Sequence, residues 1–250
     1  MNTRLFDFAW FPDFNKSIEE LKNLAMDENW DYSKHPTGKH PILVNYIHHT
    51  FCKIKVENKI EYEGEFCCFN TGLVTENQEE IYGYLQNNKK PGTTIPYYFI
   101  GWRKSSNRDL SKFSKLAEIA SYISDPSDLI YDTKLELRTN IDHIIQDNKE
   151  RFPVPFDTMD NYMLSNILHG TIEDAKRRVR RNYKTAIPQY YKGKLQLLLP
   201  LCLQTKANAD LALVIEKEND IYRASTCLTL DMAINNARLI AKPDDEWLKV

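Results

Sequence analysis

Long uncharged apolar stretches are absent from this sequence of 250 residues. The longest apolar run, LLLPLCL at 197–203, has the length of one strand, whereas a membrane-spanning helix needs about 20 such residues. The N-terminal stretch MNTRLFDFAWFPDF carries Asp7 and Pro12 inside its apolar part, which is atypical of a secretory signal peptide. The sequence therefore predicts no membrane segment and no membrane partner.

Glycine and cysteine are also scarce. Eight glycines are too few for an architecture dominated by loops. Five cysteines without a CxxC pair favour a reducing compartment over a disulfide framework, so we expect a cytoplasmic protein. The sequence also lacks a Gly-x-Ser-x-Gly elbow, an HExxH motif, a Walker motif and a Rossmann glycine fingerprint. We therefore expect no cofactor, and no motif identifies a reaction.

The composition is that of a folded protein, with 42% hydrophobic, 27% charged and 12% aromatic residues. A chain of this length buries roughly three quarters of its unfolded surface, so a core forms without disulfides. The sequence contains no internal repeat and no glycine- or serine-rich linker. We expect a single compact domain over 1–250 of the α+β class, with a mixed or largely antiparallel sheet packed against several helices.

Local patterns in the first half predict both strands and helices. Ser17 with Glu20, and Thr75 with Gln78, have the spacing of helix capping boxes. The patterns predict a helix over 17–26, and then an antiparallel strand pair or meander between 41 and 73 with turns at ENK and NTG. They further predict a helix over 79–88, a strand over 97–102 and a helix over 109–123. A helical interpretation of 42–52 stays open.

The second half shows clearer periodicity. Asn140 is a candidate N-cap for a helix that Pro153 ends. The patterns predict a strand over 134–138, a helix over 141–152, a long helix from about 160 to 186, strands over 194–203, 209–217 and 220–230, and a closing helix over 231–241.

The long helix concentrates positive charge. Its apolar stripe consists of Leu168, Ile172, Ala175, Val179 and Tyr183. Six basic residues lie within nine positions, namely Lys176, Arg177, Arg178, Arg180, Arg181 and Lys184. With Glu173 and Asp174, the segment 173–184 has a net charge of +4, although the whole chain has −2. We expect the two acids to pair with the arginines four residues further on.

Segregated positive charge beside aromatic side chains is typical of a surface that binds phosphates and unstacked bases. Tyr183, Tyr190 and Tyr191 follow the basic cluster. The leading hypothesis is therefore an RNA or nucleotide ligand bound by Arg177, Arg178, Arg180, Arg181 and Lys184, with Tyr183 or Tyr190 stacking. The alternative is a solvated helix face with pairs inside the helix.

The closing helix carries a second polar pattern. Asp231, Asn235 and Arg238 fall on one helix side by their spacing. Together with Lys184, Gln189 and His143 they suggest a phosphoester- or nucleotide-processing enzyme, in which the candidate catalytic residues are Asp231, His143 and Lys184. Alternatively, Asp231 is an N-cap in a helix held by an ion pair to Arg238.

Three further patterns are weaker evidence for a functional site. His48, His49 and Cys52 are too few for a zinc site, so we expect no metal. The run 66–81 could form an anion-binding turn before a helix, but its glutamates repel phosphate. A third functional hypothesis is a protein-interaction module in which tyrosines, tryptophans and arginines form the interface.

Several stretches carry a resemblance to a known family. They include PILVNYIHHTF, FNTGL, NIDHIIQDNKERFP, RRNYKTAIPQYYKGKLQLLLPLCL and YRASTCLTLDMAINNARLI. These segments resemble the domain of unknown function family 3825 from near Phe8 to Trp247. The resemblance implies an association with RNA metabolism, because some members join this domain to cold-shock or CCCH zinc-finger modules. It implies no catalytic residues.

Overall fold

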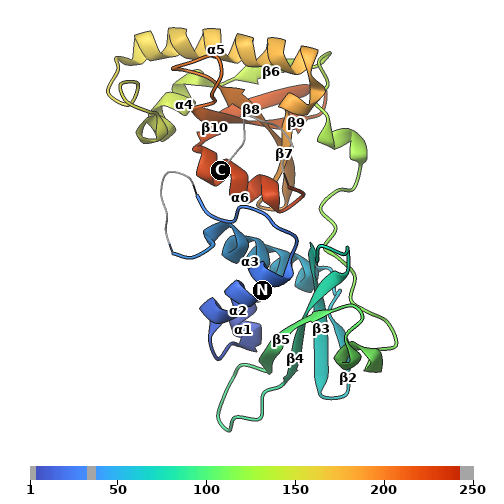
Figure 1. Cartoon of the computed structure of the whole chain (residues 1–250). Coiled ribbons are helices and arrows are strands. Elements are labelled where there is room, and N and C mark those ends of the chain that lie inside the picture. Colours follow the sequence, from blue (N-terminus) through green and yellow to red (C-terminus); the bar gives the residue numbers. More distant parts are fainter. Residues whose placement is uncertain (1–3, 33–37, 243–250) are drawn as a thin grey trace. The chain divides into compact units, whose positions relative to one another are not determined.

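The computed structural model describes residues 4–32 and 38–242. The chain divides into two compact units, unit 1 over Met1–Ser121 and unit 2 over Tyr122–Val250. Each unit contains its own five-stranded sheet and its own helices (Figure 1). The predicted α+β class is confirmed, with two mixed sheets. A single domain over 1–250 stays a prediction.

Unit 1 packs helices against a sheet with the order β1-β5-β4-β3-β2. β1 is parallel to β5 and the other pairs are antiparallel. The elements are α1 (Leu5–Phe8), β1 (Ala9–Trp10), α2 (Phe14–Leu24), α3 (Pro41–Val56), β2 (Glu61–Glu63), β3 (Phe66–Val74), β4 (Glu80–Asn87), β5 (Tyr97–Lys104) and a 3-10 helix over Arg108–Lys112.

Unit 2 has a sheet with the order β6-β10-β9-β8-β7, in which β6 is parallel to β10 and the other pairs are antiparallel. Its elements are β6 (Glu136–Thr139), α4 (Ile141–Asn148), α5 (Asn161–Arg181), β7 (Ile187–Tyr191), β8 (Lys194–Leu201), β9 (Leu211–Glu218), β10 (Ile221–Leu228) and α6 (Leu230–Arg238), with 3-10 helices over Pro126–Leu129, Lys149–Arg151 and Tyr183–Thr185. Figure 1 shows α5 and α6 on opposite sides of this sheet.

The two units repeat one topology. In each, a first strand is followed by two helices and then by a meander of four antiparallel strands, whose last strand pairs in parallel with the first. The sequence contains no internal repeat, so the two units resemble each other only in the arrangement of their backbones. Shared strand order without a shared residue pattern is invisible to a search for repeated sequence.

Several predictions for unit 1 are wrong. α2 begins earlier than expected because Asp13, and not Ser17, caps it by accepting from the Lys16 amide at 2.9 Å. Residues 41–56 form α3, so the helical alternative holds. The NTG sequence lies inside β3 at an irregularity where Gly72 has φ 74°.

Two predicted helices of unit 1 do not exist. Residues 80–87 form β4, and Thr75 belongs to the hairpin before it, accepting from the Gln78 amide at 2.9 Å. An anion-binding turn before a helix, which the glutamates already disfavour, is not formed here, because a strand follows. The segment after β5 is a short 3-10 helix and irregular chain, whose Leu110, Phe113 and Ala117 pack on the sheet.

Predictions for unit 2 are mostly confirmed. Asn140 caps α4 by accepting from the His143 amide at 3.2 Å. α5 and the strands β6, β8, β9 and β10 occur where the patterns place them. The edge strand β7 was not predicted, and Pro188 lies within it instead of ending α5.

The core of unit 2 lies between α4, α5 and one sheet face. Side chains at alternating positions of β8 and β9, including Leu199 and Leu213, pack against Leu168 and Ile172 of α5. We call this the helix face of the sheet. The opposite face carries Leu198 and Val214, and α6 covers part of it, with Asn236 donating to Gln189 at 3.1 Å.

Candidate nucleic-acid interface

Helix α5 presents the basic cluster on the surface of unit 2. Asp160 caps the helix by accepting from the Tyr162 and Met163 amides at 3.0 and 3.3 Å. The predicted apolar stripe from Leu168 to Val179 is buried in the core. Tyr183 departs from this stripe, because α5 ends at Arg181 and the Tyr183 side chain is left 61% exposed.

Three of the six basic residues form ion pairs or hydrogen bonds within unit 2. Lys176 pairs with Glu173 at 2.6 Å, and Arg177 pairs with Asp174 at 2.8 Å. Both pairs span three residues, whereas the prediction was four. Arg178 donates to the backbone oxygen of Lys206. These three side chains are therefore less available to a ligand. Exposed ion pairs are weak, however, so another anion can replace the carboxylate.

Arg180 and Arg181 differ from these neighbours. Both are exposed, and within the part of the chain that the structure describes neither has a carboxylate within 4.0 Å. The C-terminal end of a helix supplies only about half a negative charge, which is less than the charge of two guanidinium groups. This end of α5 therefore keeps a positive field that can attract an anion.

An apolar cavity of about 460 Å³ adjoins the end of α5. It lies within unit 2 and is lined by Pro126, Leu129, Ile130, Tyr183, Lys184, Ala186, Ile187, Pro188, Ala237, Ala241 and Lys242. Tyr183 and Lys184 therefore belong both to the predicted ligand-binding set and to the cavity wall. Among the residues that the structure describes, the cavity wall includes two lysines and no acid.

Tyr131 follows Ile130 of the cavity wall in sequence and belongs to the core of unit 2. Its ring stacks on Tyr222 with centroids 4.7 Å apart, and burial raises the pKa of Tyr131 to about 12. The positive charge of Arg180 acts on the same phenol and opposes that shift in its pKa.

A chain of amides crosses the face of the sheet opposite α5. Buried Gln189 accepts from Asn236 at 3.1 Å and donates to Gln196 at 2.9 Å, and Gln196 donates to Glu216 at 3.0 Å. Lys194 also pairs with Glu216, and its hydrogen bond is the main reason why the pKa of Glu216 is lowered. Gln189 is thus used within the fold, where it joins α6 to the sheet.

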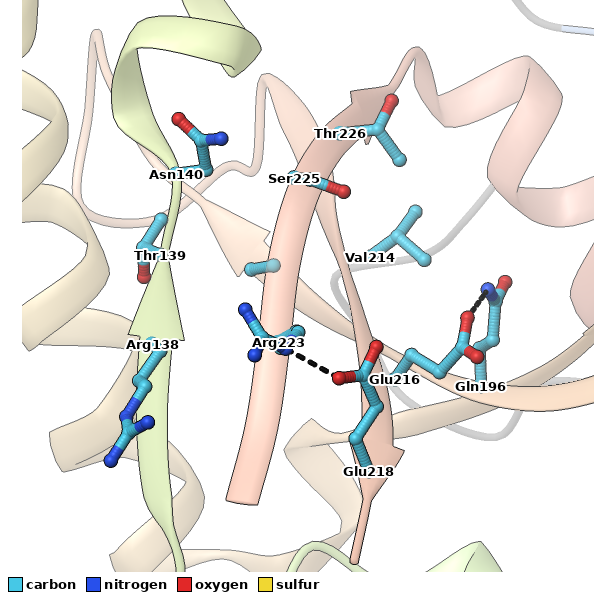
Figure 2. Close-up of a pocket in the computed structure, with 11 residues that line it drawn as sticks. Arg138, Thr139, Asn140, Gln196, Val214, Glu216, Glu218, Arg223, Ser225 and Thr226 are labelled. Carbon is cyan, nitrogen blue, oxygen red and sulfur yellow. Dashed lines mark hydrogen bonds and ion pairs between the residues drawn. The ribbon is translucent and has the colours of Figure 1, made fainter.

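A polar pocket of about 370 Å³ lies on this same face (Figure 2). Arg138 and Arg223 are neighbours on β6 and β10. Arg138 pairs with Glu136 at 2.9 Å and Arg223 with Glu218, and Figure 2 shows Gln196 bonded to Glu216 nearby. Because each arginine has a carboxylate beside it and Glu216 adds another, this pocket is less suited to a polyanion than the end of α5.

The remaining predicted binding residues are Tyr190 on β7 and Asn235 and Arg238 on α6. Tyr190 packs edge-on against Tyr122, with ring centroids 4.9 Å apart. Asn235 donates to the Asp231 backbone oxygen at 2.9 Å within α6, and Arg238 is buried. The prediction that Asp231 caps this helix is wrong, because Thr229 does so by accepting from the Met232 amide at 3.4 Å.

Two of the candidate catalytic residues, His143 and Asp231, lie on elements that cover opposite faces of the sheet. His143 lies on α4 and pairs with Asp147 at 2.9 Å, and α4 packs on the helix face of the sheet. Asp231 lies on α6, which covers the other face. An acid or base beside an anion clamp, as phosphoryl chemistry requires, is therefore not formed by this pair.

The structure offers no support for a metal centre. Over residues 4–32 and 38–242, no group of three or more His, Cys, Asp or Glu side chains is placed to hold a metal ion. His48 and His49 lie on α3, where burial lowers the pKa of both imidazoles. Burial therefore favours the neutral form of both imidazoles on α3.

The apolar cavity was missed by the sequence analysis. Its walls come from the 126–130 segment, the start of β7 and the end of α6, which are distant in sequence. The available signal was the apolar Ala-Ile-Pro sequence at 186–188, directly after the basic cluster.

Comparisons with known proteins identify the family. No helix in the described part of the chain combines the length and the apolar character needed to cross a bilayer. No curated protein and no solved structure matches the chain significantly. A family model described as "Domain of unknown function (DUF3825)" matches residues 21–247. Because this match covers parts of both units and nearly the whole length, the chain belongs to that family.

Proposed function

We propose that this protein binds RNA through phosphate contacts made by the C-terminal end of α5. The observation that carries the proposal is the exposed pair Arg180 and Arg181, which has no ion-pair partner among the described residues. Guanidinium groups bind phosphate oxygens in bidentate geometry. Displacement of counterions from the RNA then supplies much of the binding free energy.

The other cations of α5 add to this contact. Arg177 is paired with Asp174, but both side chains are more than half exposed, at 62% and 57%. A surface pair of this kind contributes at most about 1 kcal/mol, so a phosphate can displace the carboxylate at small cost. Arg180 and Arg181 form the centre of the proposed contact, and Arg177 lies at its margin.

The experiment measures binding of fluorescein-labelled RNA oligonucleotides by fluorescence anisotropy in 50 to 300 mM salt. The variant is Arg180→Glu/Arg181→Glu, and the matched control is Arg138→Glu/Arg223→Glu, which makes the same charge change on the opposite sheet face. We expect the first variant to bind at least ten-fold more weakly and to lower the slope of log K against log salt by about 1 to 2.

The control should retain the affinity and salt slope of the unmodified protein. Circular dichroism of both variants verifies that each is folded. The proposal is wrong if the unmodified protein binds none of the RNAs at 50 mM salt. It is equally wrong if both variants lose affinity to the same extent, because binding would then depend on net charge alone.

A further inference from the structure

The apolar cavity at the end of α5 suggests which form of RNA is bound. We infer that the ligand is single-stranded, and that one unpaired base enters this cavity while Arg180 and Arg181 hold the adjoining phosphates. The inference rests on the proposed function. The base in the cavity would be a second contact, apolar in character, and a substitution can remove it without changing the phosphate contacts.

The cavity wall is mainly apolar and carries positive charge. Leu129, Ile130, Ile187 and Pro188 give it an apolar surface, and its volume of about 460 Å³ lies within the range of small-ligand sites. The charged groups that the described residues contribute to the wall are two lysines, Lys184 and Lys242. An apolar slot with a cationic rim fits a flat apolar group that carries negative charge nearby, and a nucleotide has both.

Tyr183 offers an exposed ring at this cavity. Its side chain is 61% exposed, and it contacts no other aromatic ring in the described ranges 4–32 and 38–242. It lines the cavity and stands only two residues after Arg181. The phenol ring can therefore stack on a base whose phosphate is bound by the end of α5.

A duplex ligand does not use this cavity. Bases in double-stranded RNA are stacked and paired, and such RNA offers a protein its phosphates and 2′-hydroxyl groups. A duplex could contact Arg180 and Arg181 but could not place a base against Tyr183 in the cavity. The cavity thus predicts a preference for unpaired RNA that the arginines alone would not produce.

The test compares Tyr183→Ala with Tyr183→Phe and with the matched control Tyr162→Ala. Tyr162 is 76% exposed at the opposite end of α5. Binding to single-stranded and fully paired RNA of equal length is measured by anisotropy. We expect Tyr183→Ala to weaken single-strand binding about ten-fold or more with an unchanged salt slope. Binding of the duplex, and binding by Tyr183→Phe and Tyr162→Ala, should stay the same.

The outcomes separate this inference from the proposed function. If Arg180→Glu/Arg181→Glu abolishes binding but Tyr183→Ala has no effect, RNA binding stands and the base site is wrong. Equal affinity of the unmodified protein for single-stranded and paired RNA also overturns the base site. Decanoate and an acidic peptide with one apolar residue serve as competitors. If either binds at Tyr183 while single-stranded RNA does not compete, the cavity belongs to another ligand.

Discussion

At the residue scale, one glycine of unit 1 has no room for a side chain. A Cβ atom on Gly83 of β4 would lie 2.2 Å from the Phe69 ring on the neighbouring strand. Phe69 is fully buried, so its ring cannot move toward solvent. Gly83 on β4 is the cross-strand partner of Phe69 on β3. Because Gly83 has no side chain, the Phe69 ring can lie directly against its backbone.

We therefore expect Gly83→Ala to lower the free energy of unfolding by about 1–3 kcal/mol, because overpacking forces the buried ring and strands to shift. Urea unfolding followed by circular dichroism measures the change. Gly170→Ala is the matched control. It lies within α5, where nothing is found within 4 Å of the added Cβ, and alanine should stabilise the helix by up to about 1 kcal/mol. Equal stability of the two variants would contradict this description of β4.

At the scale of single elements, α5 depends on its N-terminal cap. Asp160→Ala removes the acceptor for two amides of the first turn, and we expect a loss of about 0.5–2 kcal/mol in the free energy of unfolding. Asp160→Asn keeps an acceptor oxygen and should lose much less. Urea unfolding of the three proteins tests this expectation, which would be refuted by equal losses in both variants.

The accuracy of sequence prediction differed between elements for physical reasons. α5 was predicted because one side of it is buried and the other is charged, which gives a clear helical period. β4 was predicted as a helix because residues 81–85 are all buried. With both faces covered, the alternation that marks a strand is lost.

The candidate site was also predicted in part. The basic residues and Tyr183 were visible as a local cluster, and the ion pairs within α5 were expected with a slightly different spacing. The cavity depends on three segments that meet only after folding. Gln189 was assigned to a ligand, but burial leads it to bond with Gln196 and Asn236, an environment that no sequence pattern reveals.

At the scale of the whole molecule, unit 2 contains a complete core. All members of its main hydrophobic cluster lie between Tyr131 and Cys227, within the limits of this unit. We expect residues 122–250 to fold alone, with one cooperative urea transition, and to bind RNA as strongly as the full chain. Circular dichroism and anisotropy measure both properties. An unfolded fragment would instead support the prediction of one domain over 1–250.

The pairing of first and last strands has a consequence for biosynthesis. β6 pairs in parallel with β10, so Glu136 can pair only after Ile221 has been synthesised. In unit 1, Ala9 can likewise pair only after Tyr97 has been synthesised. A ribosome therefore releases more than 80 further residues before either sheet can gain its outermost strand. Chains stalled within a meander would expose unpaired backbone and aggregate, so each unit reaches its native form only near the end of its own translation.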